Sequence, residues 1–208
     1  MKSLSLTLAA SLAAVATVRA SLYPLGAIPD GNPSGISLVG TYDGAPAGST
    51  VSSLTVSLNI SGGFNGDLYA YLVSPNGTLV MLMNQPGVSL NGFGASGAGM
   101  NITLTDAYTA NGSIQDVTSG SVLSGNYNAA GSLANFTGSQ ADGNWTLYFA
   151  DMSNGGGTSL VEGWNLNITA VPEPTTWALG IFGVGFIGVG GVRAYRNSRK
   201  LNFNTHSA

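Results

Sequence analysis

The stretch SLTVSLNI at residues 53–60 decides the fold, because its polar and apolar residues alternate strictly. Successive side chains of a β-strand point to opposite faces of a sheet, so Leu54, Val56, Leu58 and Ile60 would share one face. This period of two predicts a strand with one buried and one solvated face. The glycines that follow at 62–63 would end the strand.

Further strands surround this one. Residues 68–73 and 79–83 are apolar at nearly every position and flank a Ser-Pro-Asn-Gly turn sequence, which predicts a hairpin in the middle of a sheet. Residues 145–149 and 164–168 alternate again, and no run before residue 175 has a helical period. Short strands separated by turns indicate an all-β fold of the sandwich or jelly-roll type.

The N-terminal segment 1–20 has the parts of a secretory signal peptide. Lys2 provides the positive start, residues 4–18 are apolar, and the small-residue site ending at Ala20 precedes the predicted cleavage before Ser21. The sequence therefore predicts that the chain is exported.

The C-terminal segment 171–200 joins three features in order. A Pro-Glu-Pro motif comes first, an uncharged apolar run occupies residues 175–192, and a basic cluster occupies 193–200. The motif residues are Val171, Pro172, Glu173 and Pro174, and the basic residues are Arg193, Arg196, Arg199 and Lys200. At about 1.5 Å per residue the run would reach about 27 Å as a helix, close to the roughly 30 Å of a bilayer core. The sequence therefore predicts one transmembrane helix.

The basic cluster sets the orientation of that helix. Cationic flanks stay on the cytoplasmic side, so residues 201–208 would form a cytoplasmic tail and everything before Val171 would lie outside the membrane.

This order of features resembles the PEP-CTERM sorting signal of exported bacterial proteins. The resemblance implies processing by an exosortase-type enzyme near the Pro-Glu-Pro motif, with the helix holding the chain in the membrane meanwhile. It also implies a destination at the cell surface or in the extracellular matrix, in association with exopolysaccharide. An ordinary single-pass anchor with a proline-containing stalk is the alternative, because it satisfies the same bilayer length.

The charges are segregated along the chain. All six Lys and Arg residues lie in the signal peptide or after Gly191, and all nine Asp and Glu residues lie between Asp30 and Glu173. Nucleic-acid binding needs Lys and Arg against phosphates, so we exclude that class of partner. The chain has no cysteine, and its one histidine, His206, follows the apolar run. Disulfides, thiol chemistry and histidine catalysis are therefore excluded from the exported part.

The exported part carries a second set of motifs: GDL at residues 66–68, LVSPNGT at 72–78, GNWTL at 143–147 and GWNL at 163–166. Their order resembles the P domain that follows the catalytic domain of proprotein convertases and many bacterial subtilases. The resemblance covers residues 51–170 and implies a jelly-roll β-sandwich, with residues 21–50 as an N-terminal strand and loop region. The region before it is too short for a protease domain, and a Ser-His-Asp triad is impossible without a histidine there.

Carboxylates are the candidate metal ligands. Their oxygens suit Ca²⁺, and the resemblance implies that calcium binding is an option, since some P-like sandwiches bind it. Asp67, Asp106 and Asp151 are the candidate calcium ligands. No run such as D-x-D-x-D-G occurs, and carboxylates at strand ends and turns commonly accept hydrogen bonds from backbone N–H groups instead, so both roles stay open.

Aromatic residues are the other candidate binding groups. Trp145 and Trp164 alternate in step with Leu and Phe, so we expect them in the core, whereas Tyr69 and Tyr71 could contribute to an aromatic platform for sugars. A glycosidase needs two carboxylates across the sugar, and no recognisable pair accompanies Glu162. We predict no catalytic residue.

These features predict a non-enzymatic exported bacterial surface or matrix protein that requires no cofactor and is sorted through its C-terminal motif. The alternative is an accessory module at the cell surface that binds carbohydrate or calcium through loops at one end of the sandwich.

Overall fold

A computed structural model of the chain describes residues 16–19, 25–118 and 120–172. The chain divides into two units, residues 1–171 and 172–208, and the second lies outside the described residues except for Pro172. The strands are β1 Ala16–Arg19, β2 Gly26–Ile28, β3 Ile36–Tyr42, β4 Ser49–Gly62, β5 Leu68–Val73, β6 Leu79–Asn84, β7 Met100–Leu104, β8 Leu123–Tyr127, β9 Gly143–Asp151 and β10 Ser159–Pro172. The helical pieces are η1 Asn65–Asp67, α1 Val88–Asn91, η2 Ile114–Asp116 and η3 Leu133–Phe136. The all-β prediction is confirmed.

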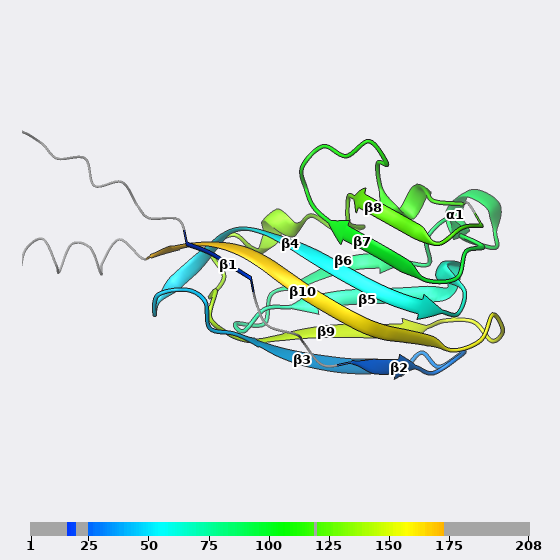
Figure 1. Cartoon of the computed structure of the whole chain (residues 1–208), viewed down its shortest axis with the longest axis horizontal. Coiled ribbons are helices and arrows are strands. Elements are labelled where there is room, and N and C mark those ends of the chain that lie inside the picture. Colours follow the sequence, from blue (N-terminus) through cyan, green and yellow to red (C-terminus); the bar gives the residue numbers. More distant parts are fainter. Residues whose placement is uncertain (1–15, 20–24, 119, 173–208) are drawn as a thin grey trace, which may run out of the picture. The chain divides into compact units, whose positions relative to one another are not determined.

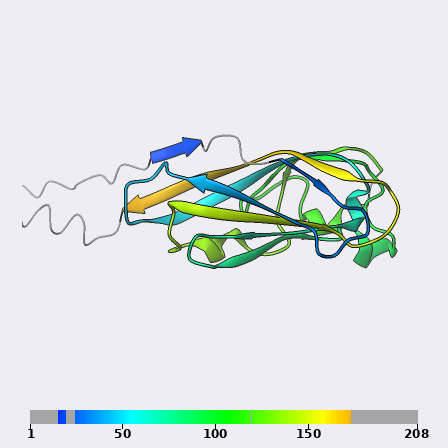
Figure 2. The same ribbon diagram turned by 90° about the horizontal axis from the view of Figure 1, so that it is seen from below.

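The strands form two sheets (Figure 1). The first sheet has the order β1-β10-β4-β7-β8, and β2 also pairs with β10. The second sheet has the order β3-β9-β5-β6. The longest strands, β4 and β10, run side by side, and the turned view shows the strands of the two sheets layered (Figure 2). One hydrophobic cluster draws residues from both sheets, so the core lies between the layers.

The predicted alternation accounts for the core. Leu54, Val56, Leu58 and Ile60 of β4 are buried, as the period of two requires. Trp145 of β9 is fully buried, and its indole N–H donates to the carbonyl oxygen of Ala141 at 3.0 Å. The Trp145 ring packs edge-on against Phe136 of η3, with centroids 5.2 Å apart, so η3 helps to close the core.

The hairpin of β5 and β6 is also where the sequence predicts it. Its turn is fixed by the Ser74 hydroxyl, which accepts from the Thr78 amide at 3.0 Å, and by Gly77 at φ +87°. That φ favours glycine because it lies in the left-handed region. β5 lies between β9 and β6, which matches the expected central position, whereas β6 is an edge strand.

The stretch before Asn128 contains a strand that the sequence analysis leaves unassigned. β8 runs parallel to β7, with Met100 opposite Leu123 and Leu104 opposite Tyr127. Only the first and last residues of β8 are buried, and the three between them are exposed. No alternation exists to be detected, because an edge strand of this kind does not bury every second side chain.

Of the two N-terminal strands, β1 lies before the predicted signal-peptide cleavage site and β2 lies after it. β1 pairs antiparallel with β10, from Ala16 opposite Ala170 to Arg19 opposite Asn167, and lies within the predicted signal peptide. Cleavage before Ser21 would remove β1 from this sheet edge and leave β2 there. The described residues contain no helix long and apolar enough to cross a membrane, and the helix predicted at 175–192 lies outside them.

Candidate functional site

Two of the candidate calcium ligands meet at one end of the second sheet. Asp67 ends η1 and Asp151 ends β9, and the register places Leu68 directly opposite Asp151. The Met152 amide donates to the carbonyl oxygen of Asp67 at 2.8 Å, which holds the two strand ends together. Asp30 of the loop after β2 adds a third carboxylate to this region, because its charge acts on both Asp67 and Asp151.

Asp151 has one satisfied and one unsatisfied oxygen. Its Oδ1 accepts from the backbone amides of Ser153 at 3.1 Å and Gly31 at 3.4 Å. The residue is 0 % exposed, and its Oδ2 is buried and has no hydrogen-bond partner among the described residues. A buried carboxylate oxygen left unpaired costs free energy, so a proton or a cation at this position would be favourable.

Burial and mutual repulsion act on the protonation of this pair. Burial raises the pKa of Asp67 above its usual value, the negative charge of Asp151 raises it further, and a hydrogen bond from the Ser153 side chain opposes both effects. Burial also raises the pKa of Asp151, against the two backbone hydrogen bonds that favour its charged form. The two carboxyl groups therefore hold protons more tightly than exposed carboxyls do.

Asp106 lies elsewhere and has a structural role. It follows the Leu104 end of β7. The opposite end of β7, at Met100, is the one near η1, because the Asn65 side-chain amide donates to the Gly99 carbonyl oxygen there. Its Oδ1 accepts from the Leu133 amide at 2.9 Å, and its Oδ2 accepts from the Ala134 amide at 2.6 Å and the Ser132 hydroxyl at 2.8 Å. Asp106 thus caps the N-terminus of η3. The structure brings Asp67 and Asp151 together and leaves Asp106 apart.

The described residues contain no group of three or more His, Cys, Asp or Glu side chains arranged to hold a metal ion. A cation beside Asp67 and Asp151 would have those two carboxylates as its charged ligands and would need backbone carbonyl or water oxygens for the rest. Calcium accepts such mixed oxygen coordination, so this donor set fits calcium better than a transition metal.

The outer face of the first sheet is a second candidate site, which we call the polar face. It consists of outward side chains of three neighbouring strands, β10, β4 and β7, most of them amides or hydroxyls. The carboxylate of Glu162 on β10 also lies on this face, where it accepts from the Asn59 side-chain amide at 3.5 Å. The members are Ser53, Thr55, Ser57 and Asn59 on β4, Asn101 and Thr103 on β7, and Asn165, Asn167 and Thr169 on β10. Their apolar neighbours in sequence are the core residues, so the alternation that builds the core also builds this face.

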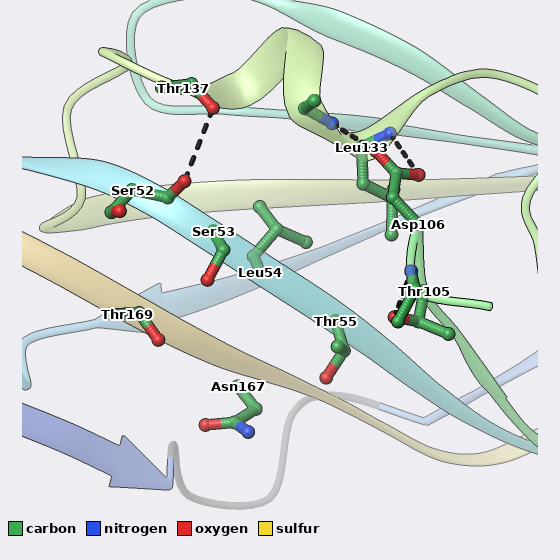
Figure 3. A pocket seen from close by; sticks show the side chains of 12 residues that line it. Ser52, Ser53, Leu54, Thr55, Thr105, Asp106, Leu133, Thr137, Asn167 and Thr169 are labelled. Atoms are coloured by element: carbon green, nitrogen blue, oxygen red, sulfur yellow. Dashed lines mark hydrogen bonds between the residues drawn. The ribbon is translucent and has the colours of Figure 1, made fainter.

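Two hollows lie on the polar face. The larger, of about 290 Å³, lies between β4, β10 and η3, and Figure 3 shows Ser53 and Thr55 on β4 beside Asn167 and Thr169 on β10. The smaller, of about 210 Å³, is lined by residues that include Ser57, Asn59, Asn101 and Asn165. This site is not predictable from sequence, because alternating Ser, Thr and Asn residues indicate a solvated strand face but do not reveal its hollows.

The aromatic residues divide as expected between core and surface. Trp145 and Trp164 are buried, at 0 % and 3 % exposure. Tyr69 and Tyr71 are half-buried on the outer face of the second sheet, where Tyr71 stacks on Tyr148 with centroids 4.5 Å apart. The Tyr71 and Tyr148 rings each cover one face of the other, which reduces the aromatic surface available to a sugar.

Part of the predicted sorting motif lies within the described residues. Val171 and Pro172 are the last residues of β10. Glu173, Pro174 and the basic residues Arg193, Arg196, Arg199 and Lys200 lie outside the described part of the chain.

Protein-family models match both the β-sandwich region and the C-terminal sorting signal. The model of the proprotein convertase P-domain matches residues 51–168, and the model of the PEP-CTERM protein-sorting motif matches residues 170–196. A P domain and a sorting signal are not catalytic domains, and the motif supports export and exosortase-dependent sorting. No curated protein matches the chain.

Two solved structures are similar. The serine protease of Aeromonas sobria is 17% identical, with 73% of this chain and 27% of that chain covered and a TM-score of 0.42. The complex of this protease with its chaperone gives 16% identity, coverage of 76% and 27%, and a TM-score of 0.43. The chain thus spans about a quarter of the length of these proteins. Because the P-domain model covers more than half of it, the chain belongs to the proprotein convertase P-domain family, and it carries a PEP-CTERM sorting motif after that domain.

Proposed function

We propose that the chain is a non-enzymatic structural protein of the bacterial cell surface or extracellular matrix. Its P domain is the part delivered, the C-terminal helix anchors it during sorting, and an exosortase-type enzyme cuts near the Pro-Glu-Pro motif. The protein then associates with exopolysaccharide.

The position of the motif carries this proposal. β10 contributes buried Ile168 and Ala170 to the core and ends at Pro172, the first proline of the motif. A cut after this point would remove no residue of the described core. Cleavage several residues earlier would remove buried side chains and expose apolar surface. The boundary of the folded domain and the boundary of the motif therefore coincide, as release of an intact domain requires.

Processing can be tested in the native host by mass spectrometry of the C-terminus. We expect matrix-fraction protein to lack residues 175–208, and we expect Glu173→Ala to keep them and stay in the membrane fraction. Glu162→Ala is the matched control, since it removes one exposed carboxylate of β10 outside the motif. Wild-type matrix protein that retains residues 175–208 would refute processing. Unchanged matrix retention in cells without exopolysaccharide synthesis would refute the association.

A second candidate function is calcium binding beside Asp67 and Asp151, supported by the Oδ2 of Asp151, which is buried and has no partner among the residues described. At a calcium concentration of about 100 times Kd, binding to the folded state alone would add about 2.7 kcal/mol to the free energy of unfolding. For a domain of this size that corresponds to a rise in Tm of roughly 5–10 °C.

Thermal unfolding of the full chain at neutral pH, in EDTA and in CaCl₂, tests this candidate. We expect calcium to raise the Tm of the wild type and of Asp106→Asn, but not that of Asp151→Asn. Equal Tm values for the wild type in the two solutions would exclude the site.

A further inference from the structure

The polar face places hydrogen-bonding side chains in rows across neighbouring strands. One row runs Ser57, Thr103, Asn126 and the next runs Asn59, Asn101, Ser124, from β4 through β7 to β8. Neighbouring strands are about 4.8 Å apart, and same-face residues of one strand are about 6.7 Å apart. The face is therefore a regular array of polar groups.

Each side chain in these rows is able both to donate and to accept hydrogen bonds. An Asn amide offers two N–H donors and a carbonyl acceptor, and a hydroxyl offers one donor and two lone pairs. The Ser57 and Thr103 hydroxyls are 3.1 Å apart and share one hydrogen bond, which leaves further capacity on both oxygens. A ligand matched to this array must itself donate and accept at many positions, as the hydroxyl groups of a polysaccharide do.

The charge of the face favours a neutral ligand. Of the residues lining the two hollows only Asp106 is charged, and its carboxylate already accepts three hydrogen bonds at the start of η3. Beside the smaller hollow, the Glu162 carboxylate accepts from the Asn59 side-chain amide, so both charged groups of the face are acidic. Residues 25–172 contain no Lys or Arg, so this region cannot neutralise a polyanion and its acidic residues repel one.

The two hollows favour an extended ligand. A polar outer face by itself is what any half-buried sheet presents to water, but here two depressions of about 290 and 210 Å³ lie on the same face. β4 and β10 line both of them, with Thr55 and Asn167 in one and Ser57 and Asn165 in the other. One extended chain along β4 and β10 would therefore enter both hollows.

We propose that the polar face binds a neutral polysaccharide chain along β4 and β10. This rests on the exopolysaccharide association in the proposed function and adds to it the surface and the chemical class of the partner. Exosortase processing plays no part in it, so a failure of one is distinguishable from a failure of the other.

Affinity electrophoresis of the full chain tests the proposal. The net charge of −3 moves the protein toward the anode, and a bound gel polysaccharide retards it. The chain is solubilised in a polyoxyethylene detergent, because a sugar-headed detergent would compete. The probes are dextran, hydroxyethylcellulose and galactomannan as neutral chains, and alginate as an acidic chain. We expect at least one neutral chain, and not alginate, to retard the protein.

The double variant Ser57→Val, Thr103→Val removes two hydroxyls from the face and places there valine side chains, which are β-branched and suited to a strand. Two lost hydrogen bonds of about 1 kcal/mol each correspond to a weakening of roughly tenfold or more. Asn167→Ala should weaken binding by about fivefold in the larger hollow. Ser37→Val, Thr146→Val is the matched control on the outer face of the second sheet and should bind as the wild type does.

Three results would overturn the proposal: no retardation by any neutral chain, retardation by alginate alone, or equal weakening by the control pair. Circular dichroism and Tm identify any variant that fails to fold, and for such a variant Asn167→Ala supplies the test. If gel filtration shows a wild-type dimer that Ser57→Val, Thr103→Val dissociates without any effect of neutral chains, the face is a contact between two copies and the proposal is wrong.

Discussion

Asp106→Ala should lower the free energy of unfolding by about 2 kcal/mol, because this carboxylate connects the end of β7 to the start of η3. It accepts hydrogen bonds from the amides of Leu133 and Ala134 and from the Ser132 hydroxyl. Figure 3 shows Asp106 beside Leu133. Leu133 and Phe136 of η3 are core residues, so the connection positions part of the hydrophobic core.

The magnitude follows from what the substitution leaves unpaired. Loss of an N-cap side chain costs about 0.5–2 kcal/mol, and each hydrogen bond to a charged group contributes about 1.5–3 kcal/mol when water is excluded. Asp106 is exposed, so water replaces part of the loss, and the Ser132 hydroxyl still accepts from the Ala134 amide at 3.3 Å. About 2 kcal/mol remains, with about 1 kcal/mol for Asp106→Asn, which keeps one acceptor oxygen.

Urea unfolding of the full chain in EDTA measures both values. Asp116→Ala is the matched control, an exposed carboxylate that accepts no hydrogen bond among the described residues, and it should change the free energy by less than about 0.5 kcal/mol. A loss below about 0.5 kcal/mol for Asp106→Ala would refute the capping role. A loss that appears only when calcium is present would instead make Asp106 a metal ligand.

Three further predictions concern the buried residues and one turn. In EDTA the wild type should lose stability as the pH rises through the raised pKa values of Asp67 and Asp151, because the folded state binds those protons more tightly than the unfolded state does. Urea unfolding between about pH 3 and pH 8 measures this dependence, which Asp151→Asn should weaken. Trp145→Ala should cost about 3–5 kcal/mol by the same assay, since its side chain is fully buried. Gly35→Ala should cost at least about 2 kcal/mol, because φ is +50° and the new Cβ would lie 2.0 Å from the Phe149 carbonyl oxygen. Gly48→Ala, at φ +77° with nothing within 4 Å, should cost only about 1 kcal/mol.

The parts of the fold predictable from sequence are those where burial alternates. β4 shows this most clearly, because each of Leu54, Val56, Leu58 and Ile60 has a polar neighbour on the opposite face. The same rule places Trp145 and Trp164 in the core. β8 is unpredictable by this rule, because only its two end residues are buried and its parallel pairing with β7 depends on the intervening chain.

The candidate sites were only partly predictable for a related reason. Asp67 and Asp151 are far apart in sequence, and only the pairing of β5 with β9 brings them together. Asp106 has the same chemistry in the sequence, and its separation from the pair depends on which end of β7 it follows. The polar face was visible as a strand pattern, but its hollows depend on η3 and on the contact of β4 with β10.

The segregation of charge explains why the carboxylates of this domain have these environments. Residues 25–172 contain no Lys or Arg with which their carboxylates could form ion pairs. These carboxylates accept hydrogen bonds from uncharged donors instead. Asp30 accepts from the Gly155 amide, Asp142 from the Ala45 amide, and Asp106 from two amides at η3. Such groups connect loops whose backbone N–H donors would otherwise be unpaired.

Asp151 departs from this pattern in one atom. Its Oδ1 accepts from two backbone amides, but its Oδ2 is buried beside the charge of Asp67 and has no partner in the part of the chain that the structure describes. In a region without basic side chains, no residue is available to neutralise that oxygen. A proton or an added cation would do so, and which of the two binds there separates a purely structural pair of carboxyl groups from a calcium site.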